Sequence, residues 1–232
     1  MKKALSILAC ALLVPLLSSP AWADDAAYSA NAVGVVKYEI PAGQLVCVAL
    51  PLNPLETSDA DQRWVWGETS LAQQLANGSD VYFWTGTGWK TYTKDIEDGI
   101  WPKGARTRVL EPGEAFFIRG ISTQTISLLG ELPTDETVPY SLTGNYALDV
   151  RGVTPYPVSG TFGTTSLSTN LPNGSDVYFW TGTGWKTYTK DIEDGIWPKG
   201  ARNYEYDVGE GIFIRAYGAV NNVNNDRPFN WE

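Results

Sequence analysis

The chain has 232 residues, a formal net charge of −9 and no histidine. The lack of histidine excludes Ser-His-Asp and Cys-His nucleophile pairs and most zinc sites. The acidic balance argues against nucleic acid as a partner, because phosphates are bound by clustered Lys and Arg. About 200 residues are enough to build one or two packed cores.

The first 23 residues have the pattern of a signal peptide. Lys2 and Lys3 precede an apolar run that ends near Leu17, and the small-x-small site at residues 21–23 follows. A proline within the run disfavours a membrane anchor, and lipidation at Cys10 leaves too short an apolar stretch before it. We expect cleavage, no membrane span afterwards, a formal charge of −11 instead of −9, and a periplasmic, cell-surface or extracellular location.

Cleavage leaves Cys47 as the single cysteine. It lies in the apolar run Leu45–Leu50, which predicts a buried thiol, and an intermolecular disulfide is the alternative. No intramolecular disulfide is then possible, so a packed core must stabilise the protein.

Most local patterns predict strands. Val35–Ile40 and Leu45–Leu50 flank Pro41-Ala42-Gly43, and Val81–Trp84 and Trp89–Thr93 flank the sequence TGTG, which is typical of a hairpin. Two further strands are expected at residues 115–119 and 125–129, and a short helix at residues 70–75.

A segment of thirty residues occurs twice. Residues 77–106 are identical to residues 173–202, and a weaker match extends through the motif G-E-x-[FI]-F-I-R. We therefore expect an all-β protein of two homologous, small β-sandwich or barrel-like modules in tandem, residues 27–134 and 135–232, with little helix.

The duplicated segment is rich in aromatic residues, which either build the core or stack on sugar rings. Trp89, Trp185, Trp101 and Trp197 are expected to be the most exposed, because they lie beside turns. The candidate ligand-binding residues are Trp84, Trp89, Tyr92, Trp101, Trp180, Trp185, Tyr188 and Trp197.

An acidic loop in each copy offers carboxylates followed by glycine, a composition that calcium sites use. The candidates are Asp95, Glu97, Asp98, Asp191, Glu193 and Asp194. The spacing is not that of an EF-hand, and a solvated turn explains the same residues. Calcium is the only cofactor that we consider, and otherwise we expect none.

Catalysis has little support in the sequence. Glu114 and Glu210 are the best candidates for a glycosidic-bond hydrolase, but a Gly-Glu pair entering a strand is better explained by a turn whose carboxylate pairs with a nearby Arg or Lys. We expect no enzyme activity.

Three segments together resemble a β-rich module of exported and cell-surface proteins of Gram-negative bacteria: Gly43 with LVCVALPLNP, then DVYFWTGTGWKTY, then LEPGEAFFIR. The resemblance covers most of both modules, although the second copy departs from it at residues 145–153 and 207–209. It implies a secreted or cell-surface module without established catalysis, and it carries over no active site.

We therefore expect a secreted, non-enzymatic structural, assembly or adhesive protein of the envelope or extracellular space. A carbohydrate-binding protein that uses the duplicated aromatic hairpins is the alternative. The expected partners are other copies of the chain or a surface glycan. The tail from Asn221 to Trp231 is expected to complete a sheet, within its own module or in a neighbour. Exact identity over thirty residues indicates either recent recopying or one demanding partner shared by both copies.

Overall fold

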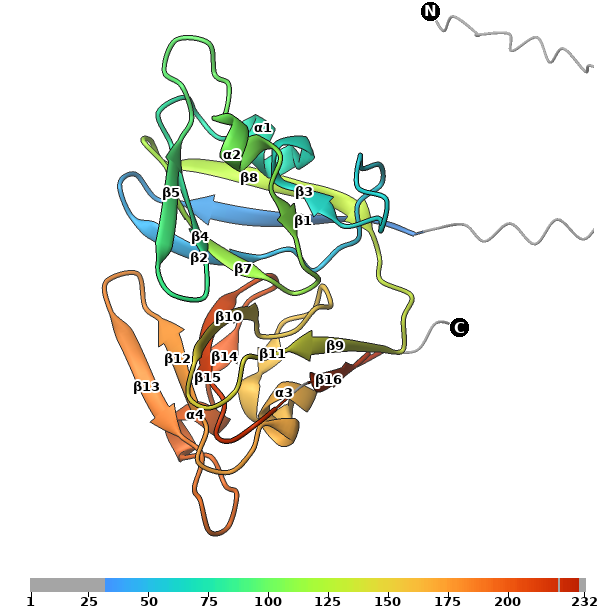
Figure 1. Cartoon of the computed structure of the whole chain (residues 1–232), viewed down its shortest axis with the longest axis vertical. Coiled ribbons are helices and arrows are strands. Elements are labelled where there is room, and N and C mark those ends of the chain that lie inside the picture. Colours follow the sequence, from blue (N-terminus) through green and yellow to red (C-terminus); the bar gives the residue numbers. More distant parts are fainter. Residues whose placement is uncertain (1–31, 221, 230–232) are drawn as a thin grey trace, which may run out of the picture. The chain divides into compact units, whose positions relative to one another are not determined.

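The computed structural model describes residues 32–220 and 222–229. The predicted signal peptide at residues 1–23, Cys10, Asn221 and residues 230–232 of the tail lie outside the described residues. The described part is mostly strand with little helix, arranged in two similar halves, which confirms the all-β prediction (Figure 1). Residues 32–134 are called the first half below and residues 135–229 the second half. Both lie in one unit, residues 31–232.

The first half, coloured from blue to yellow-green in Figure 1, is built around a four-stranded antiparallel sheet in the order β2-β7-β4-β5. A two-stranded ribbon of β1 and β8 and a short pair of β3 and β6 complete it. The elements are β1 Val33–Ile40, β2 Leu45–Ala49, β3 Trp64–Val65, the 3₁₀ turn Trp66–Glu68, α1 Ser70–Gln74, β4 Asp80–Trp84, β5 Trp89–Thr93, α2 Lys103–Arg106, β6 Val109–Leu110, β7 Ala115–Arg119 and β8 Gln124–Glu131.

The second half repeats this plan, with the sheet order β10-β15-β12-β13, the ribbon of β9 and β16 and the short pair of β11 and β14. Its elements are β9 Thr137–Ser141, β10 Leu148–Gly152, β11 Gly160–Thr161, the 3₁₀ turn Phe162–Thr164, α3 Ser166–Asn170, β12 Asp176–Trp180, β13 Trp185–Thr189, α4 Lys199–Arg202, β14 Glu205–Tyr206, β15 Gly211–Arg215 and β16 Asn222–Asp226.

The predicted strands and the predicted hairpin are confirmed, and the helix expected at residues 70–75 is present as α1, Ser70–Gln74. Helix α2, Lys103–Arg106, was not predicted. Helix α1 begins where the Thr69 side chain accepts a hydrogen bond from the Ala72 amide, at 3.0 Å. Thr165 caps α3 in the same way through the Ser168 amide, at 3.1 Å. Threonine is a favoured N-cap because its hydroxyl satisfies an amide that the helix leaves free.

The core of the first half lies between its sheet and the β1–β8 ribbon. Trp66, fully buried, packs edge to face against Phe83, Trp101 and Phe116, with ring centroids 5.2–5.8 Å apart. Phe162 occupies the corresponding place in the second half and contacts Phe179 and Trp197. Edge-to-face contacts add to the free energy of burying such large rings.

The C-terminal tail pairs within its own half. Strand β16, Asn222–Asp226, is antiparallel to β9, with Val223 opposite Tyr140. Its place corresponds to that of β8 beside β1. The intramolecular alternative for the tail is therefore confirmed for residues 222–226.

Candidate functional site: the aromatic interface between the halves

The duplicated hairpin uses both faces of its sheet. In β4, Val81 and Phe83 point into the core of the first half and are fully buried. Tyr82 and Trp84 alternate with them and belong to a separate apolar cluster that contains residues of both halves. The two-residue period of a strand produces this division.

The shared cluster is formed from the equivalent face of the two four-stranded sheets. Across the first sheet Cys47, Phe117 and Tyr82 stand opposite one another, and across the second Val150, Phe213 and Tyr178 do. The cluster consists of Cys47, Ala49, Ala115, Phe117, Val150 and Phe213, with Leu45, Tyr82, Trp84, Leu148, Tyr178 and Trp180 packed against it. We call this set the aromatic interface.

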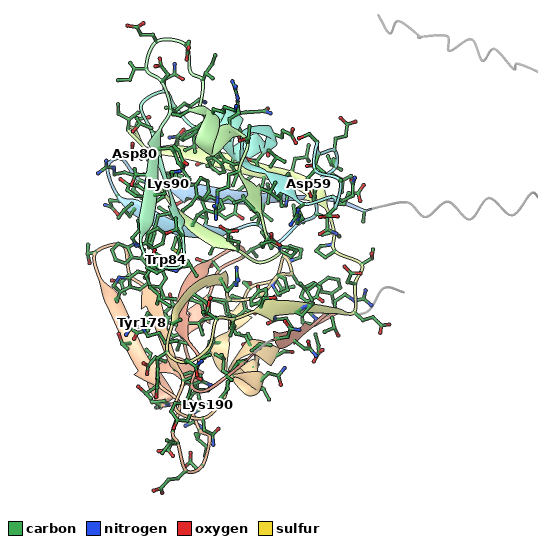
Figure 2. The ribbon with its side chains drawn as sticks, viewed as in Figure 1. Asp59, Asp80, Trp84, Lys90, Tyr178 and Lys190 are labelled. Carbon is green, nitrogen blue, oxygen red and sulfur yellow. The ribbon has the colours of Figure 1, made fainter. Side chains whose placement is uncertain are left out.

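Reciprocal hydrogen bonds join the halves across the aromatic interface. The Trp84 indole donates to the Leu148 carbonyl oxygen, and the Trp180 indole donates to the Leu45 carbonyl oxygen, each at 2.7 Å. Figure 2 shows Trp84 where the hairpin of the first half meets the second half. Each duplicated tryptophan thus binds the backbone of the other half, in the manner of a two-fold dimer interface.

Aromatic rings also meet across the interface. Trp89 stacks on Phe213 with centroids 5.6 Å apart and the planes inclined by 26°. Phe117 contacts Trp180 at 5.5 Å, Trp185 at 5.9 Å and Phe213 at 5.9 Å, all edge to face. The duplicated aromatic residues therefore contribute to a contact between the two copies.

Two tyrosines, one from each two-stranded ribbon, pack closely against glycines of the opposite half. A side chain at Gly113 would overlap the ring of Tyr140, and one at Gly209 would overlap the Tyr38 hydroxyl. Beside them, the Ala49 amide donates to the Gly209 carbonyl oxygen at 2.8 Å, and the Gly152 amide to the Gly113 carbonyl oxygen at 2.9 Å. The glycines allow backbone and ring to approach closely. No sequence pattern predicted this contact, although each glycine precedes a glutamate in the recurring motif.

The two tyrosines differ in their hydrogen bonds. The Tyr38 hydroxyl donates to the Ala49 carbonyl oxygen at 2.6 Å, whereas no described residue is a hydrogen-bond partner of the Tyr140 hydroxyl. Burial raises the pKa of both phenols, so each stays protonated in the folded protein where the unfolded chain ionises, near pH 10. Folding stability is therefore retained below pH 10 and falls as the pH rises above it.

We expect Tyr140→Phe to leave the free energy of unfolding at pH 7 unchanged or raise it by up to about 1 kcal/mol, because it removes a buried hydroxyl without a partner. Tyr38→Phe should lower it by about 1–2 kcal/mol, because the Ala49 carbonyl loses its donor. Urea unfolding at pH 7 and at pH 11 measures both effects. Each variant should also lose less stability between these pH values than the wild type. Equal losses at pH 7 for the two variants would contradict the assignment.

The structure separates the predicted ligand-binding residues into three groups. Trp101 and Trp197 are 5% and 4% exposed, so the expectation that they are exposed is wrong. Each indole folds beneath the short helix and donates to a carbonyl oxygen there, of Ala72 at 2.8 Å and of Ser168 at 2.9 Å. A neighbouring turn did not predict exposure, because the chain enters the core directly after the acidic loop.

The second group is half-buried. Tyr92 and Tyr188 pack beside Phe83 and Phe179 at the margin of each core, and Trp84 and Trp180 belong to the aromatic interface. The third group is Trp89 and Trp185, which are 37% and 36% exposed. Trp89 of the first half contacts Phe213 of the second half, and Trp185 of the second half contacts Phe117 of the first half. Of the eight candidates, these two keep the most accessible ring surface.

A buried lysine in each copy was not singled out by the sequence pattern. The Lys94 ammonium group donates to the carbonyl oxygens of Ala72, Gln73 and Leu75 at 3.1, 3.0 and 2.6 Å, at the C-terminal end of α1. Lys190 does the same at the end of α3. Burial lowers the pKa of both. A cation is favourable at a helix C-terminus, where carbonyl groups lack partners.

The acidic loops form turns. Asp95 accepts hydrogen bonds from the amides of Glu97 and Asp98 at 2.7 and 3.1 Å, and Asp98 accepts one from the Ile100 amide at 2.8 Å. The hydrogen bonds from these two backbone amides lower the pKa of the Asp95 carboxyl group. Asp191 and Asp194 repeat the pattern, with Glu193 donating its amide. In residues 32–220 and 222–229, no three His, Cys, Asp or Glu side chains are placed to hold a metal ion.

The two glutamates of the repeated motif have different partners. Glu114 forms an ion pair with Arg108, as expected. Glu210 instead accepts hydrogen bonds from the Tyr204 hydroxyl at 2.5 Å and the Asp207 amide at 3.1 Å. Its expected pairing with Arg or Lys is therefore wrong, because Tyr204 takes the place of Arg108. Burial, opposed by these bonds, raises the pKa of Glu210.

Cys47 is buried, as expected, and burial raises the pKa of its thiol. It lies against Gly211 of the second half, where an added side chain would come within 2.5 Å of its sulfur atom. A cavity of about 1000 Å³ borders this contact and lies between β1 and residues 207–211. Trp180 and Gln44 are among the residues that line it. A second one, of about 500 Å³, lies between β9 and residues 111–114.

Comparison with protein-family models, with curated proteins and with solved structures finds no match to this chain. The structure itself shows an all-β protein of two similar halves. No helix in the described part of the chain has the length and apolar character needed to span a membrane.

Proposed function

We propose that this chain is a secreted, non-enzymatic structural or assembly protein of the envelope or extracellular space. The observation that carries the proposal is the use of the duplicated hairpin. Its inner residues build the core of each half, and its outer residues, among them Trp84 and Trp180, bind the other half. Both faces of the repeated hairpin therefore have a structural role. The leader pattern at residues 1–23 and the resemblance to a module of exported proteins support the location.

A carbohydrate-binding protein is the second candidate. It is favoured by the exposed parts of Trp89 and Trp185 and by the cavity beside Trp180, since aromatic faces stack on sugar rings. Under this alternative the two tryptophans bind a ligand. Under the leading proposal they stabilise the contact between the halves.

The double variant Trp89→Ala plus Trp185→Ala separates the two proposals. If the tryptophans are structural, we expect the free energy of unfolding to fall by about 2–4 kcal/mol, because two partly buried rings lose their contacts with Phe213 and Phe117. A glycan array probed with the wild-type protein should then show no binding. Thermal unfolding and the array measure the two properties independently.

The matched control is Ile96→Ala plus Ile192→Ala, which removes duplicated apolar side chains that are 72% and 61% exposed. It should change stability by less than about 0.5 kcal/mol. Glycan binding by the wild type that the tryptophan variant loses, with no change in stability, would overturn the leading proposal and establish the alternative.

A further inference from the structure

We infer that the two halves exchange between copies of this chain, so that the aromatic interface forms between the first half of one copy and the second half of another. The inference rests on the proposed structural and assembly function and names its partner, a second copy of the same chain. The two duplicated surfaces face each other within one chain. Because each surface is already covered by the other, the two can join different chains only when the halves exchange.

Each half keeps its own core, and the halves meet at the aromatic interface, at the contacts of Tyr38 and Tyr140 with glycines of the opposite half, and at Val208, which packs against the core of the first half. The core clusters of the first half and of the second half draw their buried residues from one half each, whereas the aromatic interface takes Cys47 and Phe117 from one and Val150 and Phe213 from the other. Opening the molecule would therefore expose this interface and the sides of Tyr38 and Tyr140 that meet the opposite half, while the other residues of each core keep their partners within one half. Every contact described across it can be remade with a second copy.

The connection between the halves is short and is fixed at both of its ends. The Leu132 amide donates to the Ala32 carbonyl oxygen at 2.8 Å, which ties this residue to the first half. The carbonyl oxygen of Asp135 accepts a hydrogen bond from the Tyr156 hydroxyl at 3.0 Å, and that of Thr134 accepts one from Arg227, both in the second half. Only Pro133 lies between the two anchored stretches.

A connection of this kind favours exchange. Proline restricts its own φ and the conformation of the residue before it, so the direction in which the second half leaves the first is set by a few angles. A change at this single point directs the second half to a neighbouring chain, and a hinge too short to relax when the halves close on each other favours such exchange. Two chains that exchange reciprocally form a closed dimer with two aromatic interfaces, and open exchange forms longer chains.

The first test varies the connection of the full chain. One variant lacks Pro133 and Thr134, so that its anchored ends must join directly. The other has six Gly and Ser residues inserted between Pro133 and Thr134, and it has the same surface otherwise. By size-exclusion chromatography with light scattering, we expect the shortened variant to be a dimer or larger and the lengthened variant to be a monomer. The wild type should give dimers after refolding at about millimolar concentration, near the effective concentration of tethered domains.

The second test separates exchange from contact between intact surfaces. Isotope-labelled and unlabelled wild-type chains are mixed either in the folded state or before joint refolding, and native mass spectrometry counts mixed dimers. Exchange predicts mixed dimers only after joint refolding. This measurement needs no variant, so it decides the question even if the shortened chain does not fold.

Dimers of the lengthened variant at the wild-type level, mixed dimers on simple mixing, or a wild type that stays monomeric after concentrated refolding would each overturn the inference. None of these results bears on the proposed function itself, which the tryptophan variant and the glycan array decide.

Discussion

Gly113→Ala should lower the free energy of unfolding by about 2–5 kcal/mol. The residue has φ = +69°, where a side chain costs about 1–2 kcal/mol, and the added methyl group would also overlap the ring of Tyr140 from the opposite half. Tyr140 is fully buried, so a further cost of about 1–3 kcal/mol for overpacking is expected. Urea unfolding followed by tryptophan fluorescence measures the change.

Gly43→Ala is the matched control, because Gly43 has the same φ of +69° and no atom within 4 Å of an added side chain. It should cost about 1–2 kcal/mol, which is the backbone contribution alone. Gly209→Ala, which faces Tyr38, should resemble Gly113→Ala. If Gly113→Ala and Gly43→Ala agree within about 0.5 kcal/mol, the tight contact between the halves is not present in solution.

The second large effect is expected at Lys94. Lys94→Met should destabilise the protein by about 2–4 kcal/mol, because three carbonyl oxygens at the end of α1 lose a charged donor. The loss is limited by the cost of burying an ammonium group, which the lowered pKa of Lys94 reflects. Thermal and urea unfolding of the full chain test the prediction.

Lys90→Met, in the strand β5 that directly precedes Lys94, is the control. The Lys90 side chain is exposed and lies over the ring of Tyr92 at 5.3 Å, a contact worth about 0.5–1 kcal/mol. Figure 2 labels Lys90 in the first half and Lys190, the equivalent of Lys94, in the second. Lys190→Met should reproduce the Lys94 result with Lys186→Met as its control. A loss for Lys94→Met no greater than that for Lys90→Met would show that the ammonium group is not a structural cap.

The local elements could be predicted from the sequence because their signals are short in range. The alternation of residues in Trp89–Thr93, the glycines of the TGTG turn and the threonine before Ser70 each lie within a few residues of the structure they specify. The pairing of strands within the second half could be predicted only from its homology with the first half. That β16 takes the place of β8 followed from the position of the tail in its module.

The site could not be predicted in the same way, because it depends on contacts far apart in the chain. Trp180 and Leu45 are 135 residues apart, and the pattern of β4 is equally compatible with an exposed face and with a face covered by another sheet. Lys94 follows the strand and looks like one more exposed residue, but the chain turns beneath α1. The sequence contains the signal for the tight contacts, a glycine before each repeated glutamate, without naming the tyrosines that meet them.

The reciprocal tryptophan bonds bear on how such a sequence changes over generations. The outer face of each hairpin packs against the opposite half, through Trp84 in one copy and Trp180 in the other. A substitution on the outer face of one hairpin alters the setting of its twin. A recombination event that overwrites one copy with the other brings the change to both at once. Recopying and selection thus act in the same direction, toward two hairpins that stay alike.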